Sequence, residues 1–374
     1  MKVVITGAGG FLGQNLVTTL QRNEAIELLP ITRASSSADL DAALAQADFV
    51  IHLAGVNRPK TEDEFATGNT SFTREVCDGL IKHSRKVPLI ISSSTQAAAE
   101  NPYGLSKRGA EKVVADYALQ HGGTALIYRL TNIFGKWCRP NYNSGVATFC
   151  HNIARGLPIQ ISDRANPVKL VHVDDVISAF TEDLAAEHKP GVVQREAGPE
   201  YSLTLGELVD QIESFRDMRE SLILPDMAPG FVQKLYSTYL AYLELDQFAY
   251  GLTKHSDPRG SLAEFIKSDH FGQLFISRTK PGITRGDHYH HVKTEKFFVV
   301  DGQALVRFRD IRGEREVIEY HVDGEEMRVI DIPPGYTHSI QNIGESELIT
   351  VFWASEIFEQ AQPDTYGMPV LINE

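Results

Sequence analysis

The sequence predicts two domains of different class, a doubly wound parallel α/β sheet followed by an all-β barrel. The chain has 374 residues, and a single hydrophobic core rarely grows beyond roughly 250–300 residues. Short β-branched runs alternate with helical patterns in the first half, whereas short alternating runs broken by Gly and Pro fill the last third. The predicted domains are therefore residues 1–246 and 247–374.

Each predicted element rests on its own hydrophobic pattern. Apolar runs at 3–6, 28–31, 49–53, 89–91 and 126–128 are expected to be buried parallel strands. Apolar residues recur at helical spacing near 12–20 and 110–117, so helices are expected to cover that sheet. A helical stretch over 203–245 ends the first domain, and alternating runs at 273–279, 296–300, 304–309 and 347–352 predict the barrel strands.

Composition excludes several classes of function. The formal net charge is -13, with 42% apolar and 23% charged residues, and proteins that bind nucleic acid or membrane surfaces usually carry a basic face. The sequence has no run of about 18 apolar residues and enters its first strand without a signal-like segment. Cys77, Cys138 and Cys150 lack paired spacing, as expected in a reducing compartment. We expect a cytoplasmic protein that binds neither nucleic acid nor membrane.

A glycine-rich turn joins the first predicted strand to the first helix, as in Rossmann-type dinucleotide sites. Gly7 permits a tight turn, Gly10 lets the backbone approach a pyrophosphate, and Gly13 allows the helix to pack closely on the strand. Phe11 and Leu12 open the helix, whose free N–H groups favour an anion. These five residues are the predicted cofactor loop.

Tyr103 and Lys107 form a predicted acid–base pair, because residues four apart on a helix share a face. An ammonium near a phenol favours the phenolate and lowers its pKa, so Tyr103 can exchange a proton with a carbonyl oxygen. The strand before this helix ends in hydroxyl residues that can hold the same oxygen. Ser94 is the first choice for that role, and Thr95 is the alternative.

With these motifs, the first two thirds of the chain resembles the extended short-chain dehydrogenase/reductases. Asp48–Gly55 is similar to the strand that lines the cofactor, which implies cofactor contacts at Leu53 and Ala54 in addition to Tyr103 and Lys107. Residues 129–135 are similar to the RxxNxxG element, in which the residue corresponding to Asn132 meets the substrate diphosphate. Residues 171–176 resemble a mainly structural element of the family. The chain departs from the family at Lys136, where proline is usual, and at 97–99, which lack the usual Tyr-Gly.

The end of the second predicted strand favours NADPH over NADH. Arg33 follows it, where an acidic residue would bind the ribose 2′-hydroxyl of NADH. Arg33, with Ser35 and Ser36, can instead receive a 2′-phosphate.

In the last third, the spacing of His288, His290 and Glu295 between Gly282 and Gly302 fits the first cupin motif, and His338 lies in a match to the second. His288 and His290 alternate on one strand face, and a barrel can bring Glu295 and His338 to them. We expect one divalent ion, with zinc the first choice and iron or manganese the rivals. His291 is expected to be a bystander. Met327 stands where the second motif usually has glycine.

Together the two halves resemble the bifunctional capsular-polysaccharide enzymes that make UDP-2-acetamido-2,6-dideoxy-L-talose on the route to N-acetyl-L-fucosamine. The resemblance implies metal-dependent C3 epimerisation of a UDP-4-keto-6-deoxy-HexNAc, followed by NADPH-dependent reduction at C4. It also implies that Arg259, in a segment similar to the entry strand of keto-sugar cupins, touches the nucleotide phosphates. We expect a homodimer or higher homo-oligomer. Two alternatives stay open: a 4-ketoreductase with a non-catalytic cupin, and a sugar-nucleotide or NAD(P) sensor.

Overall fold

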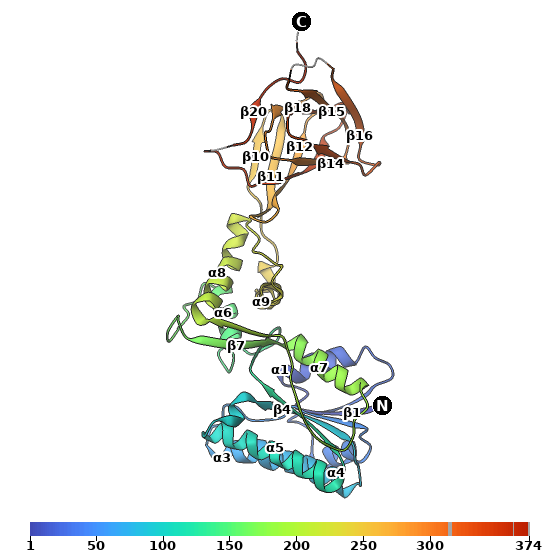
Figure 1. Ribbon diagram of the computed structural model, residues 1–374, viewed down its shortest axis with the longest axis vertical. Coiled ribbons are helices and arrows are strands. Elements are labelled where there is room, and N and C mark those ends of the chain that lie inside the picture. Colours follow the sequence, from blue (N-terminus) through green and yellow to red (C-terminus); the bar gives the residue numbers. More distant parts are fainter. Residues whose placement is uncertain (313–315, 362, 373–374) are drawn as a thin grey trace. The chain divides into compact units, whose positions relative to one another are not determined.

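The computed structural model describes residues 1–312, 316–361 and 363–372, which form two compact units (Figure 1). The first unit contains Met1–Glu213 and Gly230–Glu244, and the second contains Ser214–Pro229 and Leu245–Glu374. The chain therefore crosses between the units three times, and the boundary predicted after residue 246 lies beside the last crossing. The helical pattern over 203–245 did not reveal the other two, because periodicity does not say which core a helix end packs against.

The first unit is built on a six-stranded parallel sheet in the order β2-β1-β3-β4-β5-β8. This order reverses direction between β1 and β3, which is where doubly wound sheets bind nucleotides. The predicted parallel sheet is thus confirmed, with strand ends that differ by a few residues. Its strands are β1 Lys2–Thr6, β2 Glu27–Ile31, β3 Phe49–His52, β4 Pro88–Ser94, β5 Thr124–Leu130 and β8 Gly191–Arg195. A smaller sheet joins β6 Asn132–Phe134, β7 Pro167–His172 and β9 Glu200–Thr204.

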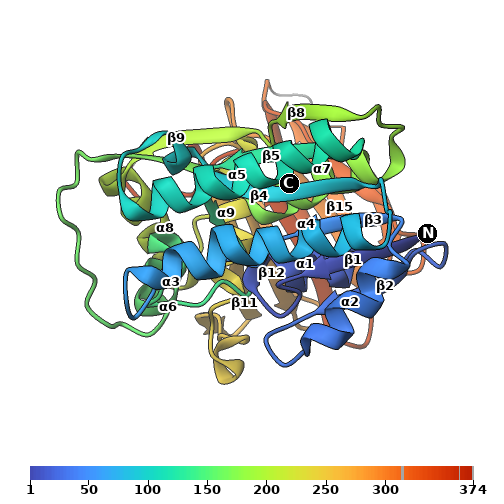
Figure 2. The same ribbon diagram turned by 90° about the horizontal axis from the view of Figure 1, so that it is seen from below.

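Helices cover both faces of the parallel sheet. On one face α4 and α5 lie side by side, and α2 packs into the same core around Val4, Val50 and Leu89 (Figure 2). On the other face α1 and α7 enclose a core around Ile5 and Leu126. The helices are α1 Phe11–Leu20, α2 Ser37–Ala45, α3 Asp63–Phe65, α4 Phe72–Lys82, α5 Pro102–His121, α6 Gly145–Ala154, α7 Val173–Ala185, α8 Leu205–Ser221 and α9 Gly230–Leu240, with short turns η1 Ala66–Ser71, η2 Thr95–Ala98 and η3 Leu245–Gln247.

The ends of α5 are set by local sequence, and this fixes the position of Tyr103. The Asn101 side chain accepts a hydrogen bond from the Gly104 N–H, and Pro102 occupies the first turn, where its missing N–H costs nothing. Gly122 closes the helix with a φ of 77°, a left-handed conformation that glycine adopts without strain. Tyr103 therefore lies in the first turn of a 20-residue helix.

The second unit is an antiparallel, cupin-like β fold, as predicted. One sheet has the order β10-β11-β12-β19-β14-β17 and the other has the order β16-β15-β18-β13-β20. Their inward residues, including Phe297, Val306 and Phe352, form one apolar core. The strands are β10 Lys254–Asp257, β11 Gly260–Ser268, β12 Gly272–Thr279, β13 Thr284–Tyr289, β14 Glu295–Asp301, β15 Gln303–Asp310, β16 Ile318–Asp323, β17 Val329–Ile332, β18 Tyr336–Asn342, β19 Leu348–Ala354 and β20 Tyr366–Gly367.

The helices and the cysteines can be compared with the expectations from composition. Within the described residues, no helix combines the length and the apolar character needed to span a membrane. Cys77, Cys138 and Cys150 are free thiols, and burial raises the pKa of Cys77 to about 12. Such a thiol is protonated at neutral pH and is therefore a poor nucleophile.

Candidate functional site

The glycine-rich turn lies where β1 and β3 end side by side. Gly7 has a φ of 71°, and a Cβ there would come within 2.7 Å of the Ala54 backbone nitrogen. A Cβ on Gly13 would lie 2.2 Å from the Gly7 carbonyl oxygen. Leu53 donates its N–H to the Thr6 carbonyl oxygen at 3.1 Å, which continues the pairing of these two strands. The structure thus brings the predicted glycine loop together with Leu53 and Ala54.

The start of α1 leaves room for an anionic cofactor. Gly10 is the N-cap residue, and no side chain caps the helix there. Phe11 and Leu12 pack into the core below the turn, so their backbone N–H groups are what they can offer to a ligand. Uncapped N–H groups at a helix start bind phosphate well. The residues present therefore fit a dinucleotide, with close approach permitted by the missing Cβ atoms.

The turn after β2 places Arg33 at the surface, but Ser35 and Ser36 already make hydrogen bonds within this turn and the start of α2. Ser36 forms a capping box with Asp39, in which its hydroxyl donates to the carboxylate and accepts the Asp39 N–H. Ser35 Oγ accepts the Thr32 N–H at 3.1 Å. Hydrogen bonds from the Ser36 backbone N–H and hydroxyl hold the pKa of Asp39 below its usual value, and the negative charge of Asp39 lies beside the hydroxyl predicted to help hold a 2′-phosphate. Arg33 is exposed and is the stronger candidate of the three.

Tyr103, Lys107 and Ser94 come together between β4 and α5, but with a different electrostatic balance from the one predicted. Burial raises the pKa of Tyr103, and a hydrogen bond with Ser94 opposes this in part. Lys107 Nζ lies 6.0 Å from the centre of the Tyr103 ring and donates to the Ser92 carbonyl oxygen at 3.0 Å. Burial lowers the pKa of Lys107 to about 8. The lowered phenol pKa expected from the sequence is therefore wrong for this structure, because burial is the larger effect.

Asn69 was missed by the sequence reasoning and lies against this group. It is 2% exposed; its Oδ1 accepts the Val56 N–H at 2.8 Å, and its Nδ2 donates to Ser106 Oγ at 2.9 Å. A Cβ on Gly55 would lie 2.8 Å from Asn69 Oδ1 and 3.4 Å from Lys107 Nζ. Asn69 therefore fixes the loop after β3 beside the lysine. A single asparagine in an irregular helical turn gives no periodic signal by which it could have been found.

Asn132 and Arg129 make mainly structural contacts in this structure. The Asn132 amide donates to the Lys169 carbonyl oxygen at 3.1 Å, and the Asn132 side chain is exposed. Arg129 binds both carboxylate oxygens of Glu111, at 2.9 and 2.7 Å, and Glu111 also accepts the Ser93 hydroxyl. The predicted diphosphate contact of Asn132 stays a prediction.

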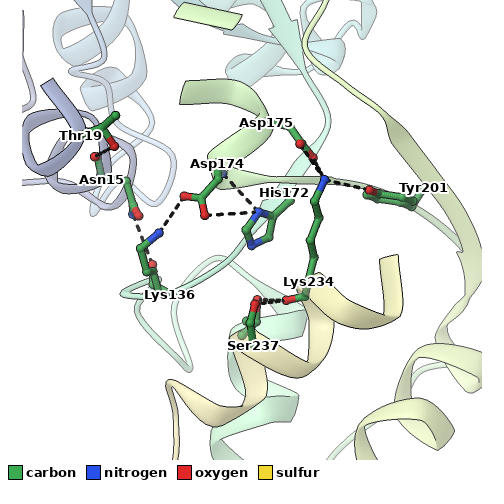
Figure 3. Close-up of polar contacts among 10 residues, drawn as sticks. Asn15, Thr19, Lys136, His172, Asp174, Asp175, Tyr201, Lys234 and Ser237 are labelled. Carbon is green, nitrogen blue, oxygen red and sulfur yellow. Dashed lines mark hydrogen bonds and ion pairs between the residues drawn. The ribbon is translucent and has the colours of Figure 1, made fainter. Parts of the chain in front are cut away.

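Lys136, which replaces the usual proline, belongs to a polar network that joins α1, α7 and α9 (Figure 3). Its Nζ lies 2.7 Å from Asp174 Oδ1, and its carbonyl oxygen accepts the Asn15 amide. Lys234 on α9 binds both carboxylate oxygens of Asp175, at 2.7 and 2.8 Å, and also donates to the Tyr201 hydroxyl. The network fixes the returning helix α9 on the first unit.

Two arginines from the loops after β3 and β6 place positive charge around the Tyr142 ring. The guanidinium of Arg58, in the loop after β3, lies 5.7 Å from the centre of the Tyr142 ring. That of Arg139, in the loop after β6, lies 5.4 Å from the same ring. Both arginines are exposed. A chain with a net charge of -13 thus still has local positive charge beside Tyr142, and such charge attracts anionic ligands.

In the second unit, His288, His290, Glu295 and His338 offer donor atoms that all lie within 4.8 Å of one another. β13 supplies His288, β14 begins at Glu295 and β18 supplies His338. His290 lies one residue past the end of β13, so its place beside His288 comes from the following turn and not from strand alternation. Glu295 Oε2 lies 3.5 Å from Nε2 of both His290 and His338.

The chemistry of this four-residue cluster fits a divalent ion. Nε2 of His290 and of His338 is buried without a hydrogen-bond partner among the described residues. Burial, and then the neighbouring His338, lowers the pKa of His288 to about 4, so this ring is neutral at physiological pH. Burial alone would raise the pKa of Glu295, but its interactions with His290 and His338 outweigh that effect and lower it. Neutral imidazole rings and an ionised carboxylate are the forms that bind zinc.

The remaining predicted residues of the β unit lie outside this cluster. Arg259 is in the turn between β10 and β11, not in a strand, and its Nη2 lies 2.6 Å from Asp257 Oδ2. A phosphate would have to share this guanidinium with Asp257. His291 is exposed and packs edge-on against Tyr366 at 5.0 Å, as a bystander would. Met327 has a φ of 50°, a backbone conformation that suits the glycine usual at this position.

Comparison with known proteins assigns the first unit. Residues 3–194 match the NAD dependent epimerase/dehydratase family, and residues 255–366 match the polysaccharide biosynthesis C-terminal domain. The chain belongs to the NAD dependent epimerase/dehydratase family. Membership confirms the predicted nicotinamide cofactor.

Relatives extend this assignment over the whole chain. UDP-2-acetamido-2,6-beta-L-arabino-hexul-4-ose reductase from Pseudomonas aeruginosa is 43% identical and covers 99% of both chains. The crystal structure of the capsular polysaccharide assembling protein CapF from Staphylococcus aureus has a TM-score of 0.92 at 43% identity, over 99% of this chain and 100% of that one. The spore coat polysaccharide biosynthesis protein SpsL from Bacillus subtilis is 32% identical over 32% of this chain and 84% of its own length. The predicted resemblance to capsular-sugar enzymes is thus confirmed.

Proposed function

We propose that this chain is a bifunctional nucleotide-sugar enzyme. The β unit epimerises C3 of a UDP-4-keto-6-deoxy-HexNAc, and the first unit then reduces C4, giving UDP-2-acetamido-2,6-dideoxy-L-talose for capsule or O-antigen synthesis. The observation that carries the proposal is the presence in one chain of an acid–base group at Tyr103 and of a four-residue cluster around His290 in which three members are buried. The name of the Pseudomonas aeruginosa relative, a reductase of a UDP-linked hexul-4-ose, supports the same substrate class.

In the first unit, the side chains divide the work of ketone reduction. When bound, the nicotinamide supplies the hydride. Tyr103 donates its phenolic proton to the C4 oxygen, and its raised pKa keeps that proton in place until it is needed. Ser94 orients the same oxygen, since it already contacts the Tyr103 hydroxyl. Lys107 supplies positive charge where negative charge develops.

In the β unit, His288, His290, Glu295 and His338 would hold one divalent ion, with zinc preferred. When bound, the ion supplies positive charge that stabilises the deprotonated form of a ketone. His288 is half-buried, whereas His290 and His338 are fully buried. Elemental analysis of protein purified without chelator should find about one ion per chain. A trace amount, or full retention in His290→Ala, would show that the ligand set is wrong.

Variants that lose C4 reduction and C3 epimerisation independently test the proposal. Tyr103→Phe should lower C4 reduction about 10²–10⁴-fold, the usual loss for an acid–base group, and should leave deuterium uptake at C3 in D₂O unchanged. His290→Ala should abolish that uptake while cofactor binding persists. NMR of the products follows both reactions. If His290→Ala exchanges at the normal rate, the proposed division of the two reactions between the units is wrong. If wild type shows no exchange at C3, the chain is a 4-ketoreductase with a non-catalytic cupin; if wild type turns over no 4-keto sugar nucleotide, a sensor is favoured.

We propose NADPH as the preferred reductant because Arg33 is exposed at the end of β2. A hydrogen-bonded charge pair with the 2′-phosphate contributes about 1.5–3 kcal/mol, or a preference of at least about tenfold. Arg33→Asp should remove this preference, measured as the ratio of kcat/KM for NADPH and NADH. Equal ratios in wild type and variant would contradict the assignment. The cytoplasmic location and the homo-oligomer stay predictions.

A further inference from the structure

We propose that Asp364 is a positioning residue of the metal site, and that residues 363–368 form the supporting layer around the ligands. This inference rests on the proposed metal site. The cupin motifs end at residue 342, so they do not contain this segment. It reaches the site from the C-terminal part of the chain, where β20 pairs with β13 and sets Gly367 opposite His288.

The Asp364 carboxylate holds the turn between the second and third ligands, His290 and Glu295. Its Oδ1 accepts the His291 N–H at 3.0 Å, and its Oδ2 accepts the N–H groups of Val292 at 2.7 Å and Lys293 at 2.8 Å. This turn joins His290 to Glu295 and has little apolar anchoring, since Val292 is 79% exposed. Hydrogen bonds to a charged acceptor are about twice as strong as neutral ones. Asp364 therefore sets the spacing of His290 and Glu295.

The backbone of Asp364 fixes the ring of His290. Its carbonyl oxygen lies within hydrogen-bond distance of His290 Nδ1. A carbonyl oxygen can only accept a hydrogen bond, so Nδ1 carries the proton and Nε2 directs its lone pair toward the centre of the four-residue cluster. That Nε2 atom is the one buried without a partner.

Thr365, the residue after Asp364, orients the ligand Glu295 through Lys293. Lys293 is 6% exposed; its Nζ donates to Thr365 Oγ1 at 2.8 Å and lies 3.9 Å from Glu295 Oε1. The other oxygen, Oε2, faces the two buried histidines. With Oε1 directed toward Lys293, Glu295 is set to bind an ion through Oε2.

Metal affinity tests this inference without any assay of catalysis. The Kd for Zn²⁺ is measured by competition with a chromophoric chelator, and the visible spectrum of the Co²⁺-substituted protein reports ligand geometry. Loss of an outer-layer partner typically weakens metal binding about 10–100-fold, so Asp364→Ala should lose affinity in that range and change the Co²⁺ spectrum per bound ion. Asp269→Ala, in an exposed turn of the same unit, is the matched control and should bind Zn²⁺ within twofold of wild type.

Asp364→Asn and metal-free melting separate positioning from folding. The asparagine keeps one acceptor oxygen but brings an amide nitrogen toward the N–H groups, so we expect at least a threefold loss of Zn²⁺ affinity with a small change in metal-free Tm. If Asp364→Ala does not fold, this variant alone decides. Wild-type affinity in a folded variant, or a lower Tm with an unchanged Co²⁺ spectrum, overturns the inference. A wild-type protein that takes up no Zn²⁺ would instead overturn the proposed metal site.

Discussion

Replacing Gly13 by alanine tests whether the β1–α1 turn is the cofactor site. Gly13 is the third residue of α1, and the added Cβ would lie 2.2 Å from the Gly7 carbonyl oxygen and 2.7 Å from Ala8 Cα. These are backbone atoms, which cannot rotate away. The start of the helix must therefore move away from the turn, and with it the N–H groups that would face a pyrophosphate.

Two opposing effects set the size of the change. Alanine stabilises a helix interior by about 0.5–1 kcal/mol relative to glycine. Overpacking of a tight contact typically costs about 1–3 kcal/mol. The clash is expected to win, leaving a net loss of about 1–2 kcal/mol in the free energy of unfolding of the first unit. Because the pyrophosphate contacts shift too, the Kd for NADPH should rise about tenfold or more, which corresponds to about 1.4 kcal/mol.

The matched control is Gly9→Ala, where the nearest atom to the new Cβ is Thr32 Cγ2 at 3.8 Å. NADPH fluorescence titration gives the Kd, and thermal melting gives stability, following the transition that NADPH shifts upward. Gly9→Ala should match wild type in both. If Gly13→Ala binds NADPH as tightly as Gly9→Ala does, the glycine turn is not the cofactor site.

Three further predictions concern charged and buried groups of the first unit. Burial lowers the pKa of Lys107 to about 8, so its positive charge is lost as the pH rises and kcat/KM for reduction should fall above about pH 8; a profile flat to about pH 9.5 would contradict this. Burial lowers the pKa of His52 to about 3, below its value of about 6.5 in the unfolded chain. The unfolded state therefore takes up a proton first as the pH falls below 6.5, and the free energy of unfolding should drop by about 2 kcal/mol at pH 5. Urea titrations at both pH values should show a smaller loss in His52→Gln. Lys234→Met leaves the half-buried Asp175 carboxylate unpaired and should lower the free energy of unfolding of the unit by about 1–2 kcal/mol. Adding Asp175→Asn should recover part of this loss, and an unchanged Tm in Lys234→Met would show that the pair contributes nothing.

The sequence predicted those parts of the fold that depend on local pattern. The glycine turn, the strand runs and the helix that carries Tyr103 and Lys107 each have a signal within a few residues, and the structure has them in place. The capping box at Ser36 also had a local signal, Ser followed three residues later by an acid, which the prediction of a phosphate contact overlooked.

Other parts of the site depend on packing and could not be read from spacing. The direction of the Tyr103 pKa follows from how deeply the ring is buried, which a helical face does not specify. Asn69 reaches Ser106 across 37 positions, and Asp364 reaches Lys293 across 71. Neither asparagine nor aspartate has a periodic or motif signal at these positions. The crossings of the chain at residues 213 and 229 were hidden for a similar reason.

The opposite pKa shifts of Tyr103 and Lys107 set the protonation states from which the proposed acid–base pair starts. Burial raises the pKa of the phenol and lowers that of the ammonium to about 8, because each shift disfavours the charged form. Near neutral pH the phenol therefore keeps its proton, and most of the lysine stays charged. A ketone reduction consumes a proton at the carbonyl oxygen, and a protonated phenol beside a positive charge provides it. The reverse reaction, alcohol oxidation, starts from the phenolate, so we expect oxidation to need a higher pH than reduction.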